Sequence, residues 1–272
     1  MEKQRTLVMG ILNVTPDSFA DGGKHLLIND AIKRAEEMIE EGVDIIDIGG
    51  ESTKPGADRV SAEEEEARVI PALREIAKLG VPISVDTTRT SLAEKAIALG
   101  ATYINDVSGG LADETMYSLI AKNPSIQYVA MHWRGHSKSM QDLAVYKDVV
   151  SEVREEIESR VNAAIDAGVN PEQIIIDPGI GFSKTAEHNW EILRNIDRLS
   201  LLGYPILVGA SRKRFLGDLT GATNPDHREA ASIALTTLMA KQGVWAVRTH
   251  SVKPHRDAIE TVEAIRRDRV EK

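Results

Sequence analysis

One unit recurs along the chain: a helical pattern, then a glycine, then a short apolar run. The glycines that mark it are Gly42, Gly80, Gly100, Gly168, Gly203 and Gly243. A glycine directly after a helix can take the left-handed conformation that ends it, so each mark predicts a helix that leads straight into a strand. Eight strands are predicted, at residues 7–14, 44–48, 82–86, 102–106, 127–132, 174–177, 205–210 and 245–250.

Helical patterns separate these strands, near residues 30–41, 61–79, 91–99, 113–122, 147–167, 185–200, 228–242 and 254–268. Eight alternations within 272 residues favour an α/β fold, a single (β/α)8 TIM barrel that forms one domain over residues 1–272. A doubly wound open sheet is the alternative, but the glycine-rich dinucleotide fingerprint does not follow the first strand. Long connections are expected after strands 1, 2 and 5, at residues 13–29, 49–60 and 132–146, and loops of that length are usually functional.

Charge and composition narrow the range of partners. A formal net charge of −9 argues against nucleic acid or an anionic membrane surface. The absence of cysteine excludes disulfides, thiolate catalysis and cysteine metal sites. The apolar run at residues 7–14 is too short to span a membrane and lacks a cleavage-site pattern, so we expect a cytoplasmic enzyme.

The predicted strand at residues 174–177 ends in a carboxylate. Three isoleucines, Ile174 to Ile176, are typical of a strand that is buried on both faces. The run stops at Asp177, and Pro178-Gly179 prevents regular structure from continuing. Asp177 therefore lies at the carboxyl end of a buried strand, where parallel α/β proteins bind ligands. Taken alone, it could equally cap the next helix.

Polar residues recur at the other strand ends. They are Asn13, Asp47 with Glu51, Asp86, Asn105 with Asp106, His132, Asp177, Ser211, and Arg248 with His250. Because a barrel gathers its strand ends around one mouth, this near-complete ring predicts a binding site rather than a set of independent caps.

The chemistry of the predicted ring divides in two. Asn105 and Asp177 could hold an aminopyrimidinone ring by paired hydrogen bonds, with Asp86 as a further acceptor. The basic half comprises residues 211–214 (Ser-Arg-Lys-Arg), Arg248 and His250. Loops after the last two strands of a barrel often bind phosphate, although a solvated basic cluster is the alternative.

Several longer motifs resemble bacterial dihydropteroate synthases. They are Gly10-Ile11-Leu12-Asn13-Val14-Thr15-Pro16-Asp17-Ser18-Phe19 with Asp21-Gly22-Gly23, Gly49-Gly50-Glu51-Ser52-Thr53-Lys54-Pro55-Gly56-Ala57, Asp177-Pro178-Gly179-Ile180-Gly181-Phe182-Ser183-Lys184 and Gly209-Ala210-Ser211-Arg212-Lys213. They occur in the family's order and span essentially the whole chain. The resemblance implies condensation of 6-hydroxymethyl-7,8-dihydropterin diphosphate with 4-aminobenzoate, to give 7,8-dihydropteroate and pyrophosphate in folate biosynthesis. It also implies a homodimer, a Mg²⁺ cofactor and a target of sulfonamides.

The resemblance carries residue roles with it. Catalytic roles fall on Asp86, Asp177 and Lys213. Substrate-binding roles fall on Thr53, Pro55, Asp86, Asn105, Met131, Asp177, Phe182, Ser211, Arg212, Lys213, Arg248 and His250. Asn13 is similar to the residue that meets Mg²⁺. Within these sets the pterin is assigned to Asp86, Asn105, Asp177, Lys213 and Arg248, and the aminobenzoate to Thr53, Pro55, Phe182, Ser211 and Arg212.

The expected chemistry is a dissociative substitution without a covalent enzyme intermediate. A neutral arylamine needs no strong base, whereas diphosphate must leave a methylene carbon. The conjugated pterin can delocalise the cation that develops, and Asp86 or Asp177 can stabilise it. Since the loop at residues 49–60 has little apolar content to pin it, we expect aminobenzoate to bind only after the pterin diphosphate.

Three positions depart from the family pattern: Lys54 stands where arginine is common, and Thr249 and Ser251 stand where valine and aspartate are usual. Lysine keeps the charge but loses bidentate geometry. Two other interpretations remain, a pterin-dependent methyltransferase and a non-catalytic pterin-binding paralogue. The methyltransferase would have no use for residues 211–213, and loss of chemistry would have removed Asn13, Thr53, Lys213 or His250, all of which are present.

Overall fold

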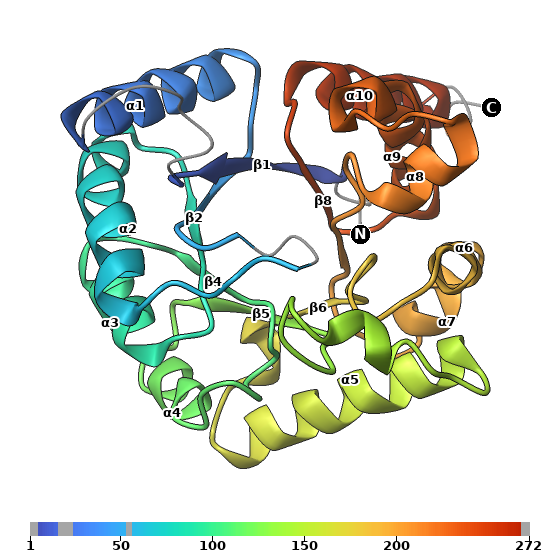
Figure 1. Ribbon diagram of the computed structural model, residues 1–272, viewed down its shortest axis with the longest axis horizontal. Coiled ribbons are helices and arrows are strands. Elements are labelled where there is room, and N and C mark those ends of the chain that lie inside the picture. The colour runs from blue at the N-terminus through green and yellow to red at the C-terminus, as the bar shows by residue number, and fades with distance from the viewer. Residues whose placement is uncertain (1–4, 16–23, 53–55, 268–272) are drawn as a thin grey trace.

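A computed structural model describes residues 5–15, 24–52 and 56–267 of the chain. Its eight strands surround a central axis, as Figure 1 shows. They are β1 (Leu7–Asn13), β2 (Ile45–Gly49), β3 (Ile83–Asp86), β4 (Tyr103–Asp106), β5 (Gln127–Met131), β6 (Ile174–Asp177), β7 (Leu207–Val208) and β8 (Ala246–Thr249).

The strands form one parallel sheet that nearly closes on itself. Their order is β6-β5-β4-β3-β2-β1-β8-β7, so β1 pairs with both β2 and β8. A parallel bridge between Ile176 and Ile206 brings the chain before β7 beside β6. The predicted TIM barrel is therefore confirmed, and the doubly wound alternative is wrong.

Helices surround the sheet (Figure 1). They are α1 (Lys24–Glu40), α2 (Ala62–Ile76), α3 (Thr90–Ala98), α4 (Met116–Ala121), α5 (Val149–Asp166), α6 (Ala186–Arg194), α7 (Ile196–Ser200), α8 (Arg214–Thr220), α9 (Glu229–Gln242) and α10 (Lys253–Arg267). In the described part of the chain, no helix combines the length and apolar character needed to cross a membrane.

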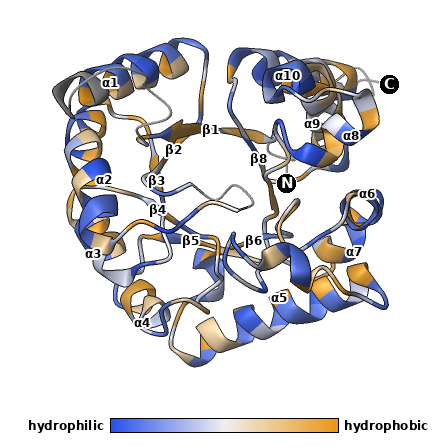
Figure 2. Ribbon diagram, in the orientation of Figure 1, coloured by the Kyte–Doolittle hydropathy of each residue, from blue (hydrophilic) through white to orange (hydrophobic). Residues whose placement is uncertain are grey.

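Apolar packing occurs in two layers. The larger core lies between the outer faces of the strands and the helices and includes Ile46, Ile104 and Ile259. A smaller cluster fills the barrel interior; its buried members are Met9, Ile45, Val129, Ile175, Leu207 and Ala246. Figure 2 shows β1 as hydrophobic almost throughout, whereas the surrounding helices carry both kinds of residue. This interior cluster, called the apolar floor below, lies directly beneath the residues at the strand ends.

Some element boundaries differ from the sequence-based expectation. Strand β7 is limited to Leu207–Val208, much shorter than residues 205–210. The helix predicted at residues 185–200 breaks into α6 and α7 at Asn195, whose φ of −118° is not helical. Helix α8, directly after residues 211–213, was not predicted at all.

Candidate active site

Strand alternation sets which residues enter the mouth of the barrel. Side chains two positions apart share a face, so the residues that follow the apolar floor on each strand also point inward. These are Asn13, Asp47, Asp86, Asn105, Met131, Asp177 and Arg248, with Gly209 after β7. The register places Asp86 beside Asn105 and Met131 beside Asp177.

Arg248 links two carboxylates across the mouth. Its Nε donates to Asp47 Oδ2 at 2.6 Å, and its Nη2 donates to Asp86 Oδ2 at 2.8 Å. Asn105 Nδ2 also donates to Asp47 Oδ2, at 3.2 Å. Burial raises the pKa of Asp86 to about 7; Arg248 opposes this shift and Asp47 adds to it. The predicted pterin residues Asp86, Asn105 and Arg248 are thus brought together around Asp47.

Asp47 belongs to the site. From the sequence it was predicted to lie at a strand end, but no role was assigned to it. It is completely buried, and its Oδ1 atom has no hydrogen-bond partner among the described residues. Ser84 Oγ, on the neighbouring strand, has none there either. Because buried polar atoms are almost always satisfied, both atoms are suited to a ligand or a water molecule. The signal that identifies Asp47 is its inward register two positions after Ile45.

Asp177 and Lys213 carry opposite charges that influence each other in the mouth. Asp177 Oδ1 accepts a 2.7 Å hydrogen bond from the Gly179 amide. Lys213 Nζ donates to the carbonyl of Ile180 and lies 4.5 Å from the centre of the Phe182 ring. Burial lowers the pKa of Lys213 to about 8, against the opposing effect of Asp177. Burial likewise raises the pKa of Asp177, and Lys213 opposes that shift.

The turn after β7 contacts the end of β8. Ser211 Oγ lies 3.1 Å from His250 Nδ1, and the His250 amide donates to Ser211 Oγ at 3.3 Å. Burial, together with the positive charges of Arg248 and Arg212, lowers the pKa of His250 to about 3. His250 is therefore a neutral ring at ordinary pH, able to donate from one nitrogen and accept at the other.

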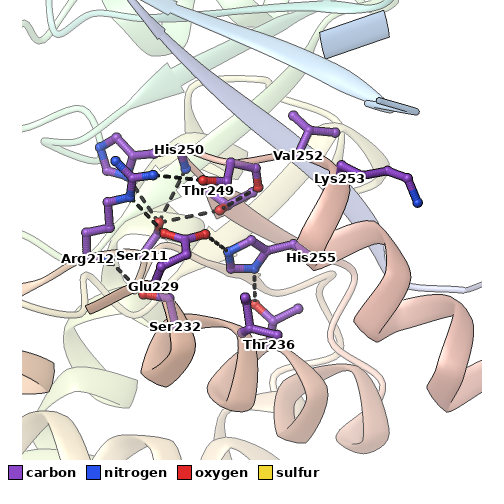
Figure 3. Close-up of polar contacts among 12 residues, drawn as sticks. Ser211, Arg212, Glu229, Ser232, Thr236, Thr249, His250, Val252, Lys253 and His255 are labelled. Carbon is purple, nitrogen blue, oxygen red and sulfur yellow. Dashed lines mark hydrogen bonds and ion pairs between the residues drawn. The ribbon is translucent and has the colours of Figure 1, made fainter. Parts of the chain in front are cut away.

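Two departures from the family pattern, Thr249 at the end of β8 and Ser251 two residues later, have polar partners; Thr249 is labelled in Figure 3. Thr249 Oγ1 donates to the carbonyl of Ser251 at 3.1 Å and to Ser211 Oγ at 3.4 Å. Ser251 Oγ accepts from Arg212 Nη2 at 2.8 Å. Both substitutions thus keep polar contact with the predicted aminobenzoate residues Ser211 and Arg212.

Two residues of the predicted ring lie outside the mouth. Asp106 alternates with inward-facing Asn105 and accepts hydrogen bonds from Ser108, Gly110 and Tyr128. His132 is enclosed between Lys184, at 2.8 Å from Nδ1, and Glu156, at 3.0 Å from Nε2. Their polar side chains stabilise the loops after β4 and β5, so their inclusion in the ring was wrong.

The connection after β2, at residues 49–60, is called the second loop here, and polar contacts hold its described part. Gly56 N donates to Ser137 O at 2.9 Å, and Arg59 Nε donates to Glu51 Oε1 at 3.0 Å. A cleft beside these contacts is lined by Glu51, Arg59, Glu65, Asp86, Thr87, Thr88, Val107, Trp133, His136, Ser137 and Phe182. The predicted residues Thr53 and Pro55, and Lys54 between them, lie outside the described residues.

Two oxygen atoms of a kind suited to a hard cation lie near Gly49. A methyl group built on Gly49 would lie 3.6 Å from Asn13 Oδ1 and 3.8 Å from Asp86 Oδ2. In the part of the chain that the structure describes, no cluster of three histidine, cysteine, aspartate or glutamate side chains is arranged to hold a metal. Amide and carboxylate oxygens are the ligands that Mg²⁺ prefers, and it often takes only one or two from protein when a substrate phosphate supplies others.

Comparison with known proteins gives consistent matches. The family model described as "Pterin binding enzyme" matches residues 9–250. A dihydropteroate synthase of Mycobacterium leprae is 44% identical over 263 residues, which cover 94% of this chain and 92% of that protein. The structure of Xanthomonas albilineans dihydropteroate synthase with 4-aminobenzoic acid has a TM-score of 0.90 at 41% identity and covers 96% of this chain and 93% of that one. That of Yersinia pestis dihydropteroate synthase with a sulfonamide drug has a TM-score of 0.90 at 37% identity, covering 98% and 96%.

Proposed function

The chain belongs to the pterin binding enzymes and, among them, to the dihydropteroate synthases, and from this premise we propose how the residues of its mouth act. The enzyme is a transferase of folate synthesis. It joins 6-hydroxymethyl-7,8-dihydropterin diphosphate to 4-aminobenzoate and releases pyrophosphate. One observation carries the assignment of roles: Asp86 and Asp177 stand above an apolar floor, next to Arg248 and Lys213 respectively.

The pterin ring lies in the mouth on this apolar floor. Its edge displays N–H and NH₂ donors, from which the Asp177 carboxylate accepts hydrogen bonds, whereas the Asn105 amide can accept from a donor and donate to a ring acceptor. Asp177 Oδ2 is free of the Gly179 contact, because that hydrogen bond is made by Oδ1. Arg248 and Lys213 approach the ring from β8 and from the turn after β7, and Met131 adds an apolar wall beside Asp177.

The aminobenzoate lies above the pterin, against Phe182, Ser211 and Arg212. Its carboxylate is suited to the basic turn at residues 211–213, and its ring to the face of Phe182. Thr53 and Pro55 complete this pocket by the resemblance of the second loop. Its amine then points down toward the methylene carbon of the pterin.

The diphosphate lies on the side of Asn13, Arg248 and His250. Asn13, with Asp86 nearby, would hold a Mg²⁺ ion bound to the diphosphate through side-chain oxygens. When bound, such an ion neutralises charge on the departing pyrophosphate. Arg248 adds a permanent cation there, since Asp47 and Asp86 outweigh its burial and raise its pKa.

Bond breaking precedes bond making in this mechanism. The bond between methylene carbon and diphosphate oxygen breaks with its electron pair leaving on pyrophosphate, and the ring delocalises the resulting cation. In their ionised forms, Asp86 and Asp177 stabilise that cation from fixed positions in a preorganised, water-poor site. The neutral amine of aminobenzoate attacks the carbon through its lone pair, and the resulting protonated amine passes its proton to the released pyrophosphate or to water. No covalent bond to the protein is formed at any step.

Assembly and location follow from the family resemblance. A homodimer, a cytoplasmic location, and a single domain over residues 1–272 stay predictions.

Release of pyrophosphate that depends on 4-aminobenzoate tests the function. Wild-type protein with pterin diphosphate, Mg²⁺ and aminobenzoate should release it, and omission of aminobenzoate should reduce release to background. Asp177→Asn should be inactive yet fold, because the substitution changes one oxygen to an NH₂ group. Pterin binding without pyrophosphate release from the wild type would instead identify a non-catalytic pterin-binding protein.

A further inference from the structure

Arg212 has an unusual backbone conformation, which is held by contacts with helix α9 and with the residue directly before that helix. Its φ is +58°, a left-handed value that residues other than glycine seldom adopt. Its amide donates to Ser232 Oγ at 2.9 Å, and its carbonyl accepts from Arg228 Nη1 at 3.0 Å. The backbone of the turn at Arg212 thus depends on contacts from a segment that takes no part in the mechanism above.

Three side chains contact the guanidinium of Arg212; one of them, Glu229, is labelled in Figure 3. Nε donates to Glu229 Oε2 at 2.8 Å, Nη1 to Asp226 Oδ1 at 2.6 Å, and Nη2 to Ser251 Oγ at 2.8 Å. The Asp226 side chain is 71% exposed, whereas that of Glu229 is 22% exposed. Exposed ion pairs contribute little because water screens them, so Glu229 is the carboxylate that fixes Arg212.

Glu229 is itself fixed by a buried histidine. His255, which is 1% exposed, has Nε2 at 3.1 Å from Glu229 Oε1 and Nδ1 at 2.8 Å from Thr236 Oγ1. Figure 3 shows this chain of contacts running from Arg212 through Glu229 and His255 to Thr236. Although burial acts to raise it, hydrogen bonds from His255, Arg212 and Ser251 lower the pKa of Glu229 to about 2. Glu229 is therefore ionised under any ordinary assay condition.

We propose that Glu229, held by His255, is a positioning residue that fixes Arg212 for aminobenzoate. The inference rests on the proposed function of Arg212. The proposal predicts different effects on the aminobenzoate pocket and on the pterin pocket, because Lys213 is anchored separately from Arg212. The Lys213 ammonium is held by the carbonyl of Ile180 and the face of Phe182, both in the loop after β6. Loss of the Glu229 charge should therefore disturb the aminobenzoate pocket and leave the pterin pocket intact.

Glu229→Gln tests this, since glutamine keeps the shape and removes the charge. We expect the KM for aminobenzoate to rise about tenfold, as for loss of one charge-assisted contact, with kcat and the KM for pterin diphosphate within about twofold of wild type. Asp226→Asn is the matched control, because it removes the exposed carboxylate from the same guanidinium; its KM for aminobenzoate should stay within about twofold of wild type.

A second variant separates positioning from a general loss of stability. Ser251 Oγ already lies 2.8 Å from Arg212 Nη2, so Ser251→Asp places a carboxylate within reach of the same group. The double variant Glu229→Gln/Ser251→Asp should regain most of the wild-type KM for aminobenzoate. Should Glu229→Gln alone not fold, a folded double variant with that KM would give the same support.

The outcomes distinguish this inference from the proposed function. Inactive wild-type protein would overturn the function and, with it, the inference. An active wild type with an unchanged KM for aminobenzoate in Glu229→Gln would overturn the inference alone. An equal rise in both KM values, or a double variant no better than Glu229→Gln, would do the same, because it would mark Glu229 as merely structural.

Discussion

Arg248 Nε lies 2.6 Å from Asp47 Oδ2, although 201 residues separate them in the sequence. The Asp47 side chain is 0% exposed and that of Arg248 17%. The pair joins the neighbours on either side of β1, since β1 pairs with both β2 and β8. It stabilises the closed barrel and orients Arg248 toward Asp86, so a structural contact and the site share one guanidinium.

Asp47→Asn should lower the free energy of unfolding by about 2–4 kcal/mol, because it removes one charge of a buried pair and leaves the other poorly compensated. Urea denaturation measures this loss. Asp58→Asn provides the control, since its ion pair with Lys138 is exposed and should leave stability unchanged. Equal effects of the two substitutions would contradict a special role for the Asp47–Arg248 pair.

Lys213 predicts a pH dependence of both activity and stability. Because the free enzyme's Lys213 loses its proton as the pH rises through about 8, kcat/KM for pterin diphosphate should fall above that pH. In the unfolded chain the pKa is near 10.5, so between about pH 8 and 10.5 the unfolded state holds a proton that the folded state lacks, and Lys213 makes stability rise with pH there. Lys213→Met should weaken pterin binding and turnover together and abolish both pH effects. A variant with wild-type kinetics would show that the lysine does not meet the substrate.

Gly209→Ala should block the pterin site without unfolding the protein. The added methyl group would lie 3.8 Å from both Asp177 Oδ2 and Arg248 Cβ, an ordinary van der Waals distance. It would, however, project between two residues that we assign to the ring. We expect at least about a tenfold loss of pterin affinity by calorimetry, the cost of roughly 1.4 kcal/mol, with an unchanged melting temperature. Normal affinity in this variant would place the ring elsewhere.

Aminobenzoate should bind second. Its proposed pocket is completed from below by the pterin and from the side by the second loop, whose described part is held mainly by polar contacts such as Arg59 to Glu51. Aminobenzoate alone should therefore give no thermal stabilisation. In the presence of pterin, pyrophosphate and Mg²⁺ it should raise the melting temperature further. Saturable binding to the ligand-free protein at similar affinity would show a preformed pocket and a random order.

Most of the fold follows from local signals. The three isoleucines before Asp177 form most of strand β6. The recurring glycines lie where helices end, and Gly80 and Gly243, for example, have left-handed φ angles. The break between α6 and α7 at Asn195 is harder to predict, because no glycine or proline marks it in the sequence. The shortness of β7 depends on pairing with β8 and not on its own apolar residues.

The candidate site was predicted in outline and not in detail. Adjacent polar residues such as Asn105 and Asp106 face opposite sides of a strand, and composition alone does not say which faces inward. The contact of Arg248 with Asp47 depends on the register of the closed barrel, and that of Glu229 with Arg212 depends on how α9 packs against the turn after β7. His255 gives no sequence signal, because a single histidine in an amphipathic helix has no pattern.

The apolar floor fills the barrel interior, so that the space above it opens only at the mouth. Its members are Met9, Ile45, Val129, Ile175, Leu207 and Ala246. Whatever lies deepest must enter first and leave last, because the floor gives it no other exit. A pterin on this floor is covered by aminobenzoate before the reaction and joined to it afterwards. The product must then be withdrawn by its aminobenzoate end, so the speed of that withdrawal limits how soon the next pterin can enter.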